Sequence, residues 1–297
     1  MSAFIASRPA NISAARAAGL PSYATELAAF HRGFAPELQQ AIDLLPLTPE
    51  MRVIDVGCGD GFYLPLLARK LNFHGAVIGL DRSAPFLNLA RHNVDLCAAR
   101  CRVDLIAGSF SDIPEHCRAC DLVWCAQCLY TLPEPAEALR QMARILKPGG
   151  ILAVLENDTL HQLILPWSPR LEIALRAAEY RALEQDAADP EKYYVGRHLP
   201  ALFREAGLKL LGLRTQAINR HAPMDWDLTM FLRSYLERLA RRVRPYLERE
   251  VWEEFERQID PSSSSDLLHQ PDFAMTWINI LAWGQTDAKG PNSTSGS

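Results

Sequence analysis

Short apolar runs alternate with amphipathic stretches through the first half of the chain. Five runs of five or six residues are mostly apolar, as in buried strands, and they are 52–56, 76–80, 103–107, 121–126 and 151–155. Between them, apolar positions recur every three or four residues, as on one face of a helix. These helical stretches are 62–71, 84–98 and 134–146. Strands that alternate with helices predict crossover connections and a parallel sheet with helices on both faces.

The alternation breaks after residue 156. The remaining elements are expected to be helices at 171–186, 197–206 and 226–256, the last broken near Pro245, and strands at 208–215 and 273–283. The pattern therefore predicts an α/β fold of three layers around a seven-stranded, mostly parallel sheet. Two helical insertions, 157–196 and 217–270, are expected to form a lid, and we expect no strand in the first of them.

The chain is predicted to form a single domain at 22–286. Apolar residues at spacings of three and four over 22–45 indicate one or two helices before the first strand. The parts of the domain are an N-terminal helical cap (22–50), a core (51–156) and the two insertions, preceded by a flexible arm (1–21) and followed by a disordered tail (287–297). A transit peptide would have a composition similar to that of the arm, without acidic residues.

Composition narrows the class of protein. Of the 297 residues, 48% are hydrophobic and 22% are charged, values that are usual for a globular protein. The formal net charge of −4 provides no cationic field for a nucleic acid, and no apolar stretch approaches the roughly 20 residues of a membrane-spanning helix. We therefore expect no nucleic-acid partner, no membrane span and a cytoplasmic location.

All seven cysteines lie between Cys58 and Cys128. Two pairs, Cys117 with Cys120 and Cys125 with Cys128, have a spacing similar to that of the ligands in a zinc site. However, 121–126 is an expected strand, and neighbouring side chains of a strand point to opposite faces. We therefore predict free thiols in a reducing compartment and no metal site.

A glycine-rich turn follows the first expected strand. Gly57, Gly59 and Gly61 occupy alternate positions directly before a helical stretch. Glycines let a ligand approach the backbone closely, and the start of a helix offers free N–H groups. A dinucleotide-binding fingerprint would need glycine where the chain has Phe62, and the Gly-Lys-Ser/Thr of a phosphate-binding loop is missing. The turn is therefore suited to another polar cofactor.

An acidic residue ends the second expected strand. Asp81 lies twenty residues beyond Gly61, where a carboxylate can accept hydrogen bonds from both hydroxyls of a ribose. With Asp55 two residues before its first glycine, the turn resembles motif I of the class I S-adenosylmethionine-dependent methyltransferases. The segment 143–150, Ala-Arg-Ile-Leu-Lys-Pro-Gly-Gly, is similar to the family's signature before strand five, where it serves as a structural turn.

The resemblance implies a Rossmann-like fold and S-adenosylmethionine as the cofactor. Ser109 occupies the position of the acid that usually binds adenine, Phe110 is placed to pack on the adenine, and Gln127 corresponds to a polar residue beside the methionine half. The residues expected to bind the cofactor are Asp55, Gly57, Cys58, Gly59, Gly61, Asp81, Arg82, Ser109, Phe110, Gln127 and Arg32.

The methyl acceptor is expected beyond the carboxyl ends of the strands, where ligands of open α/β sheets bind. His161 and Glu156 are the candidate catalytic bases, although His161 also fits an ordinary surface histidine. The residues expected to contact the acceptor or close over it are Tyr23, His31, Tyr130, Tyr193, Tyr194 and Arg197. A solvated helix face is the alternative for the first two, and core packing is the alternative for Tyr193 and Tyr194.

The function implied by the resemblance is methyl transfer from S-adenosylmethionine by in-line displacement. The near-neutral charge favours a small-molecule metabolite as the acceptor, and we expect the methyl group to go to one of its oxygen or nitrogen atoms. An RNA or protein methyltransferase and a noncatalytic cofactor-binding protein of the same fold are the alternatives. The first alternative predicts a basic surface, which the net charge does not favour. The sequence leaves open whether the protein is a monomer or a homodimer.

Overall fold

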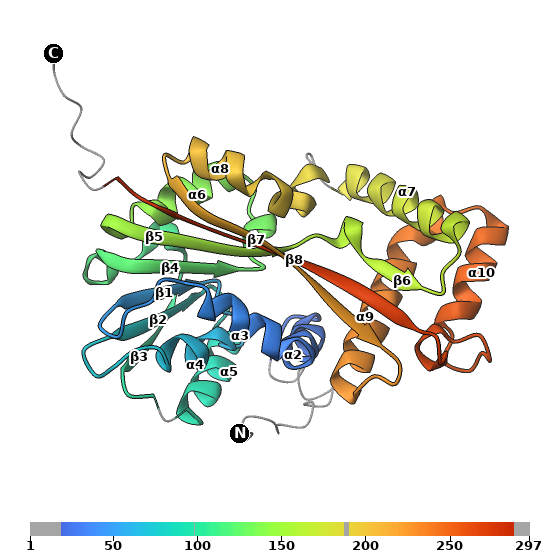
Figure 1. The fold of residues 1–297 in the computed structure, drawn as a ribbon, viewed down its shortest axis with the longest axis horizontal. Coiled ribbons are helices and arrows are strands. Elements are labelled where there is room, and N and C mark those ends of the chain that lie inside the picture. The colour runs from blue at the N-terminus through green and yellow to red at the C-terminus, as the bar shows by residue number, and fades with distance from the viewer. Residues whose placement is uncertain (1–18, 98, 187–189, 288–297) are drawn as a thin grey trace, which may run out of the picture.

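A central β-sheet with helices on both faces forms the protein (Figure 1). The computed structural model describes residues 19–97, 99–186 and 190–287. The arm at 1–21 and the tail at 287–297 therefore lie almost entirely outside the described residues. The first five strands are β1 (Arg52–Val56), β2 (Ala76–Asp81), β3 (Arg102–Ala107), β4 (Cys120–Ala126) and β5 (Leu146–Asn157). They pair in parallel in the order β3-β2-β1-β4-β5.

The second part of the sheet is antiparallel and centres on the long strand β8 (Ala274–Gln285). β8 pairs with β5, with β6 (Leu163–Leu165) and with β7 (Lys209–His221). The predicted α/β fold is confirmed, but the described residues form eight strands instead of seven. β8 extends beyond the end of β5, and β6 pairs with the backbone groups that would otherwise be left open there. The expectation that 157–196 contains no strand is thus wrong.

Two expected boundaries also differ. β5 begins at Leu146, so the segment 143–150, expected as a turn, lies partly within the strand next to a register shift between Cys120 and Leu122. β7 continues to His221 because it pairs with β8 along its whole length, so 217–221 belongs to the sheet and not to an insertion.

The expected helices are largely confirmed. The helices that cover the sheet are α2 (Ala24–Gly33), α3 (Ala35–Asp43), α4 (Tyr63–Ala68), α5 (Ala84–Asp95), α6 (Pro135–Ala143) and α8 (Leu199–Glu205). The insertions supply α7 (Pro169–Asp186), α9 (Trp226–Val243) and α10 (Arg249–Ile259), which lie around the end of the sheet where β6 and β8 pair (Figure 1). A short turn at Arg244–Tyr246 separates α9 from α10, as expected from Pro245. The chain before α8 is a 3₁₀ segment, Pro190–His198.

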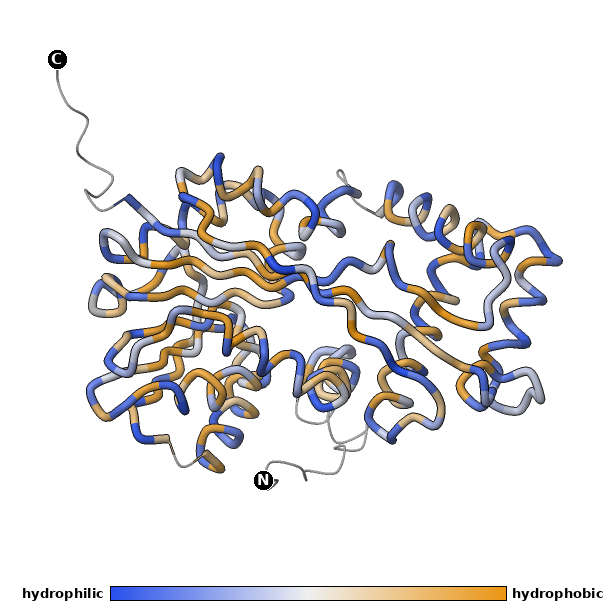
Figure 2. The backbone as a smooth tube through the Cα atoms, viewed as in Figure 1, coloured by the Kyte–Doolittle hydropathy of each residue, from blue (hydrophilic) through white to orange (hydrophobic). Residues whose placement is uncertain are grey.

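Two apolar clusters lie on opposite faces of the sheet. One cluster joins α2, α3, α4 and the insertion helices α7, α9 and α10 to the face that carries Trp124. The other joins α6 and α8 to the face that carries Val123. Figure 2 shows the hydrophobic residues concentrated along the central strands. Burial of both faces is typical of parallel sheets. No helix in the described part of the chain is long and apolar enough to cross a membrane.

Candidate active site

The carboxyl ends of the parallel strands bring four of the expected site residues to one edge of the sheet. Asp55 lies in β1, Asp81 ends β2, Gln127 follows β4, and Glu156 lies near the end of β5. Since β2, β1, β4 and β5 are neighbours in that order, these four side chains lie along a single edge. This is the edge at which open α/β sheets bind ligands.

At both ends of the glycine turn, the backbone angle and the lack of space each require glycine. Gly57 and Gly61 have φ angles of +71° and +77°, in the left-handed region that side chains disfavour. A Cβ atom at Gly57 would lie 2.6 Å from Cys128 Sγ, and one at Gly61 would lie 2.7 Å from the Ala90 Cα. Cys58 is buried between them, and burial raises the pKa of its thiol. The turn is thus packed against both the loop after β4 and α5.

Asp81 is held in place by the backbone around it. Its Oδ2 accepts a hydrogen bond from Gly59 N at 2.9 Å, and its Oδ1 accepts one from Ser83 N at 2.8 Å. Each carboxylate oxygen has a further lone pair, so both remain able to accept a ribose hydroxyl. The next residue, Arg82, is exposed. Gly108 N donates to the Asp81 carbonyl at 2.9 Å, which ties the expected adenine loop to the same position.

Two buried polar atoms at this edge lack partners among the described residues. Asp55 is 1% exposed and its Oδ2 is unpaired, while Gln127 uses Oε1 to accept from the Tyr63 hydroxyl at 3.2 Å and leaves Nε2 unpaired. Burial, reinforced by Cys128, Asp81 and Asp60, raises the pKa of Asp55. One free acceptor and one free donor on neighbouring strands match the ammonium and carboxylate groups of an amino acid. The residues present therefore fit the methionine half of S-adenosylmethionine.

Helix α2 lies over the glycine turn through residues spaced four apart. Leu27 Cδ2 would lie 3.6 Å from a Cβ atom at Gly59. His31 is 5% exposed, its Nδ1 lies 3.2 Å from Asp60 Oδ2, and its ring stacks on Phe62 with centroids 4.4 Å apart. His31 thus lies against the glycine turn and not on a solvated helix face.

The ionisation of the neighbouring groups reflects this placement of α2. Burial would raise the pKa of Asp60, but the charge and hydrogen bond of His31 lower it below the usual value. Tyr23, at the start of α2, is 55% exposed and its ring lies 5.7 Å from that of Phe86. Partial burial, followed by the charges of Asp81 and Cys128, raises its pKa. α2 therefore has the position of a cover over the expected cofactor site.

Two ion pairs join α2 to α9. Arg32 Nε donates to Asp227 Oδ1 at 2.7 Å, and Arg238 Nη2 donates to Glu26 Oε1 at 2.6 Å. The guanidinium of Arg32 is thus engaged by α9, and its expected contact with the cofactor carboxylate stays a prediction. Sequence reasoning missed the second pair, since nothing in the local pattern links residues 212 positions apart.

The expected adenine loop adopts a short 3₁₀ turn, Phe110–Asp112. Ser109 Oγ accepts hydrogen bonds from Ser111 N at 3.4 Å and from Ser111 Oγ at 3.1 Å. Phe110 is half-buried against the second apolar cluster. The adenine contacts of both residues stay predictions.

Glu156 anchors the loop that follows β4. It is 2% exposed, and its Oε1 accepts from Leu129 N at 2.8 Å. Burial, followed by the charge of Cys128, raises its pKa to about 8, although backbone N–H groups at Leu129, Tyr130 and Cys128 lower it in part. A carboxyl group with this pKa exchanges its proton near neutral pH, which is what a general base requires.

His161 lies in an ion-pair cluster at the start of the first insertion, just after β5. Arg197 binds Asp158 through two hydrogen bonds, Nε to Oδ2 at 2.8 Å and Nη2 to Oδ1 at 3.1 Å. Arg197 Nη2 also lies 2.6 Å from His161 Nδ1, and the His161 side chain is 68% exposed. The structure thus brings the two expected residues His161 and Arg197 together around Asp158, which directly follows β5.

Besides Tyr23, the other three expected tyrosines separate into two places. Tyr130 and Tyr193 lie together, with ring centroids 6.4 Å apart, on the loop that Glu156 anchors and on the 3₁₀ segment before α8. Tyr194 is buried and stacks on Tyr180 at an interplanar angle of 16°, and burial raises its pKa to about 12. Tyr194 therefore packs in the core against α7, as its alternative interpretation stated. Tyr130 and Tyr193 instead border the carboxyl ends of the strands.

Replacing Glu156 with glutamine should change how stability depends on pH. The group has a pKa of about 8 when folded and 4.5 in its reference state, so the folded protein keeps a proton that the unfolded chain releases between these values. The wild type should therefore lose stability relative to the variant, by about 1.4 kcal/mol per pH unit at most, as pH rises from about 5 to about 8. Glutamine retains the oxygen that accepts from Leu129 N.

Thermal or urea unfolding of the two proteins at several pH values measures this difference. It should be small near pH 5 and constant above about pH 9. Stability curves that run parallel from pH 5 to 9 would show that Glu156 is ionised throughout, and would remove the basis for its raised pKa.

Comparisons with known proteins agree with the geometry of this edge. A family model described as "Methyltransferase domain" matches residues 47–207. A demethylmenaquinone methyltransferase of Lactiplantibacillus plantarum is 32% identical over 183 residues, which cover 58% of this chain and 76% of the relative. A 2-phytyl-1,4-naphtoquinone methyltransferase of Synechococcus elongatus is 30% identical over 168 residues, covering 54% and 72%.

A solved structure supports the fold alone. The Bacillus halodurans protein BH2331 superposes with a TM-score of 0.53 at 17% identity, over 85% of this chain and 99% of its own. The family match ends at residue 207, so β7, α9, α10 and β8 lie outside it.

Proposed function

Since the chain belongs to the methyltransferase-domain family and is an S-adenosylmethionine-dependent enzyme, we propose that it methylates an oxygen or nitrogen atom of a small-molecule metabolite. The acceptor would lie at the carboxyl edge of the sheet, between the loop that carries Tyr130 and the 3₁₀ segment that carries Tyr193. The names of the two relatives, which specify naphthoquinone-type acceptors, support a small and partly apolar molecule.

The observation that carries the proposal is the acidic and aromatic character of this edge. Asp55, Asp81 and Glu156 end neighbouring parts of the sheet, and the charges of Asp81 and Asp60 add to the raised pKa of Asp55. The negative charges of Asp81 and Asp60 beside this edge favour a cationic sulfonium and disfavour a polyanion. Tyr130 and Tyr193 form an aromatic pair beside this edge that is partly open to solvent. Aromatic walls with few polar groups are typical of small-molecule sites.

The chain's own residues would mainly position and enclose the reactants. The cofactor supplies an activated methyl group, so the protein needs to align an attacking atom with it and to exclude water. Asp55 and Gln127 would orient the methionine half, and Asp81 would hold the ribose. α2 would cover the turn through Leu27 and His31. Glu156 would accept a proton where the acceptor must lose one.

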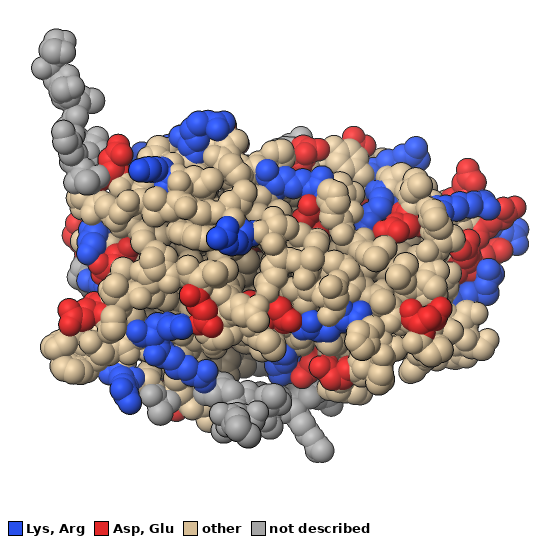
Figure 3. Space-filling model, in the orientation of Figure 1, with Lys and Arg blue, Asp and Glu red and all other residues tan. Residues whose placement is uncertain are grey.

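The face of the molecule shown in Figure 3 gives no support to a nucleic-acid substrate. Basic and acidic side chains are interspersed over the face shown in Figure 3, and no extended basic patch is seen there. The net charge of the chain is −4. Proteins that bind RNA or DNA usually concentrate Lys and Arg on one face.

A methyl-transfer assay tests the proposal. The enzyme is incubated with S-adenosylmethionine labelled in its methyl group and a cell extract separated into small-molecule, RNA and protein fractions. The label should enter the small-molecule fraction, and the Asp81→Asn variant should transfer at least tenfold less at limiting cofactor. Label that enters only RNA or only protein would reject the proposal in favour of a macromolecular acceptor.

A further inference from the structure

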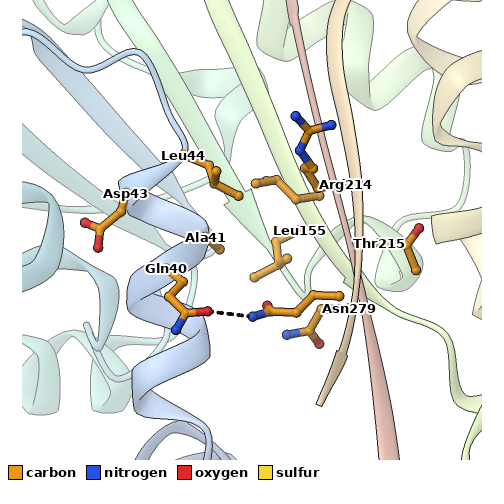
Figure 4. Close-up of a pocket in the computed structure, with 10 residues that line it drawn as sticks. Gln40, Ala41, Asp43, Leu44, Leu155, Arg214, Thr215 and Asn279 are labelled. Atoms are coloured by element: carbon orange, nitrogen blue, oxygen red, sulfur yellow. Dashed lines mark hydrogen bonds between the residues drawn. The ribbon is translucent and has the colours of Figure 1, made fainter.

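A cavity lies outside the candidate active site. It has a volume of about 430 Å³ and opens between α3 and the strands β5, β7 and β8 (Figure 4). None of its lining residues belongs to the set expected to bind cofactor or acceptor. Its apolar wall is formed by Leu44, Leu155 and Leu281. A cavity of this size is in the range that binds drug-sized molecules.

An unpaired amide lines this cavity. Asn279 is 1% exposed, yet neither its Oδ1 nor its Nδ2 has a partner among the described residues. Asn157, directly opposite on β5, also has an unpaired Oδ1. The neighbouring Gln216 is satisfied, because its Nε2 donates to Gln40 Oε1 at 2.8 Å (Figure 4). Buried polar groups are nearly always hydrogen-bonded, so this amide is free to bond to a polar atom that enters the cavity.

The rim of the cavity carries a positive charge. Arg214 is exposed, and its one hydrogen bond among the described residues is from Nη1 to the Leu213 carbonyl at 3.3 Å. The carboxylate that also borders the cavity, Asp43, pairs with Lys70 Nζ at 2.6 Å and points away from the opening (Figure 4). The guanidinium of Arg214 is thus available to an anionic group.

We propose that this cavity is a second binding site, for a small amphipathic anion that has an apolar body and one carboxylate or sulfonate. The apolar body would contact Leu155 and Leu281, the Asn279 amide would bond to a polar atom at depth, and Arg214 would bind the anion at the rim. Leu155 O accepts from Gln127 N at 2.8 Å, so the site adjoins the active site through β5 without sharing its side chains.

Two fluorescent probes of nearly the same shape test this site. 1-Anilinonaphthalene-8-sulfonate is an amphipathic anion, and N-phenyl-1-naphthylamine lacks its sulfonate. Both are titrated into the full chain with saturating S-adenosylhomocysteine, so that the candidate active site is occupied. The anion should bind at a ratio of one to one. Arg214→Gln should weaken the anion about tenfold and leave the neutral probe within about twofold.

Two further variants complete the test. Arg204→Gln removes an exposed arginine of α8 and should change neither affinity. Leu44→Trp narrows the cavity at a half-exposed position and should weaken both probes. Equal affinity of the anion for the Arg214 and Arg204 variants, or binding that does not saturate, would overturn the proposal.

Discussion

Replacing Asp81 with asparagine should weaken the binding of S-adenosylmethionine by about 10- to 100-fold, because two charge-assisted hydrogen bonds to the ribose are lost or reversed. The carboxylate already accepts from Gly59 N and Ser83 N. An amide keeps only one acceptor oxygen, so it cannot serve both backbone donors and both hydroxyls. Isothermal titration of the two proteins with S-adenosylmethionine measures the change.

Asp95→Asn is the matched control for this experiment. Asp95 is an exposed residue at the end of α5, and its replacement removes the same charge without touching the strand ends. Its affinity should equal that of the wild type. If Asp81→Asn bound the cofactor as tightly as Asp95→Asn, the ribose would not lie at the end of β2.

Replacing Gly61 with alanine should lower the free energy of unfolding by about 2–5 kcal/mol. The left-handed φ of +77° costs about 1–2 kcal/mol for any other residue. The added Cβ would also lie 2.7 Å from the Ala90 Cα, and relief of such overpacking costs about 1–3 kcal/mol more. Urea unfolding measures the loss, and a change in the midpoint without a change in slope would show that stability alone is affected.

Gly207→Ala separates the two contributions. Gly207 has nearly the same φ, +75°, but no atom lies within 4 Å of the position of its Cβ. Its replacement should therefore cost only the backbone contribution of about 1–2 kcal/mol. Equal losses in the two variants would contradict the close approach of α5 to the glycine turn.

The regular part of the fold was predictable because its signals are local. The five parallel strands follow short apolar runs, and the glycine turn needs glycine for the positive φ of Gly57 and Gly61. Asp81 was found from its distance along the chain to the turn. The position of Asp55 was also correct at the strand end, but only the structure shows that its Oδ2 is buried and unpaired.

The parts that depend on distant contacts were not predictable. β6 has three residues and forms because β8 extends past β5, which no local pattern reveals. The contact of His31 with Asp60 and the ion pair of Arg238 with Glu26 each join segments that are remote in sequence. Tyr193 and Tyr194 are adjacent in the chain, yet Tyr193 borders the carboxyl ends of the strands and Tyr194 packs against α7.

The chain after residue 207 connects the cover of the glycine turn to the insertion helices. It lies outside the family match, and it supplies α9, whose Asp227 and Arg238 bind α2. The cover over the glycine turn is therefore attached to a part of the chain that the family model does not describe. We expect differences in acceptor choice between this protein and its relatives to arise from this part.

A crystal structure of the protein with S-adenosylhomocysteine tests the assignment of the carboxyl edge most directly. Both ribose hydroxyls should lie about 2.6–3.2 Å from the Asp81 carboxylate, and the amino-acid end should take the unpaired atoms of Asp55 and Gln127. A ribose bound away from Asp81, or a nucleoside found in the cavity beside Asn279 instead, would contradict the assignment.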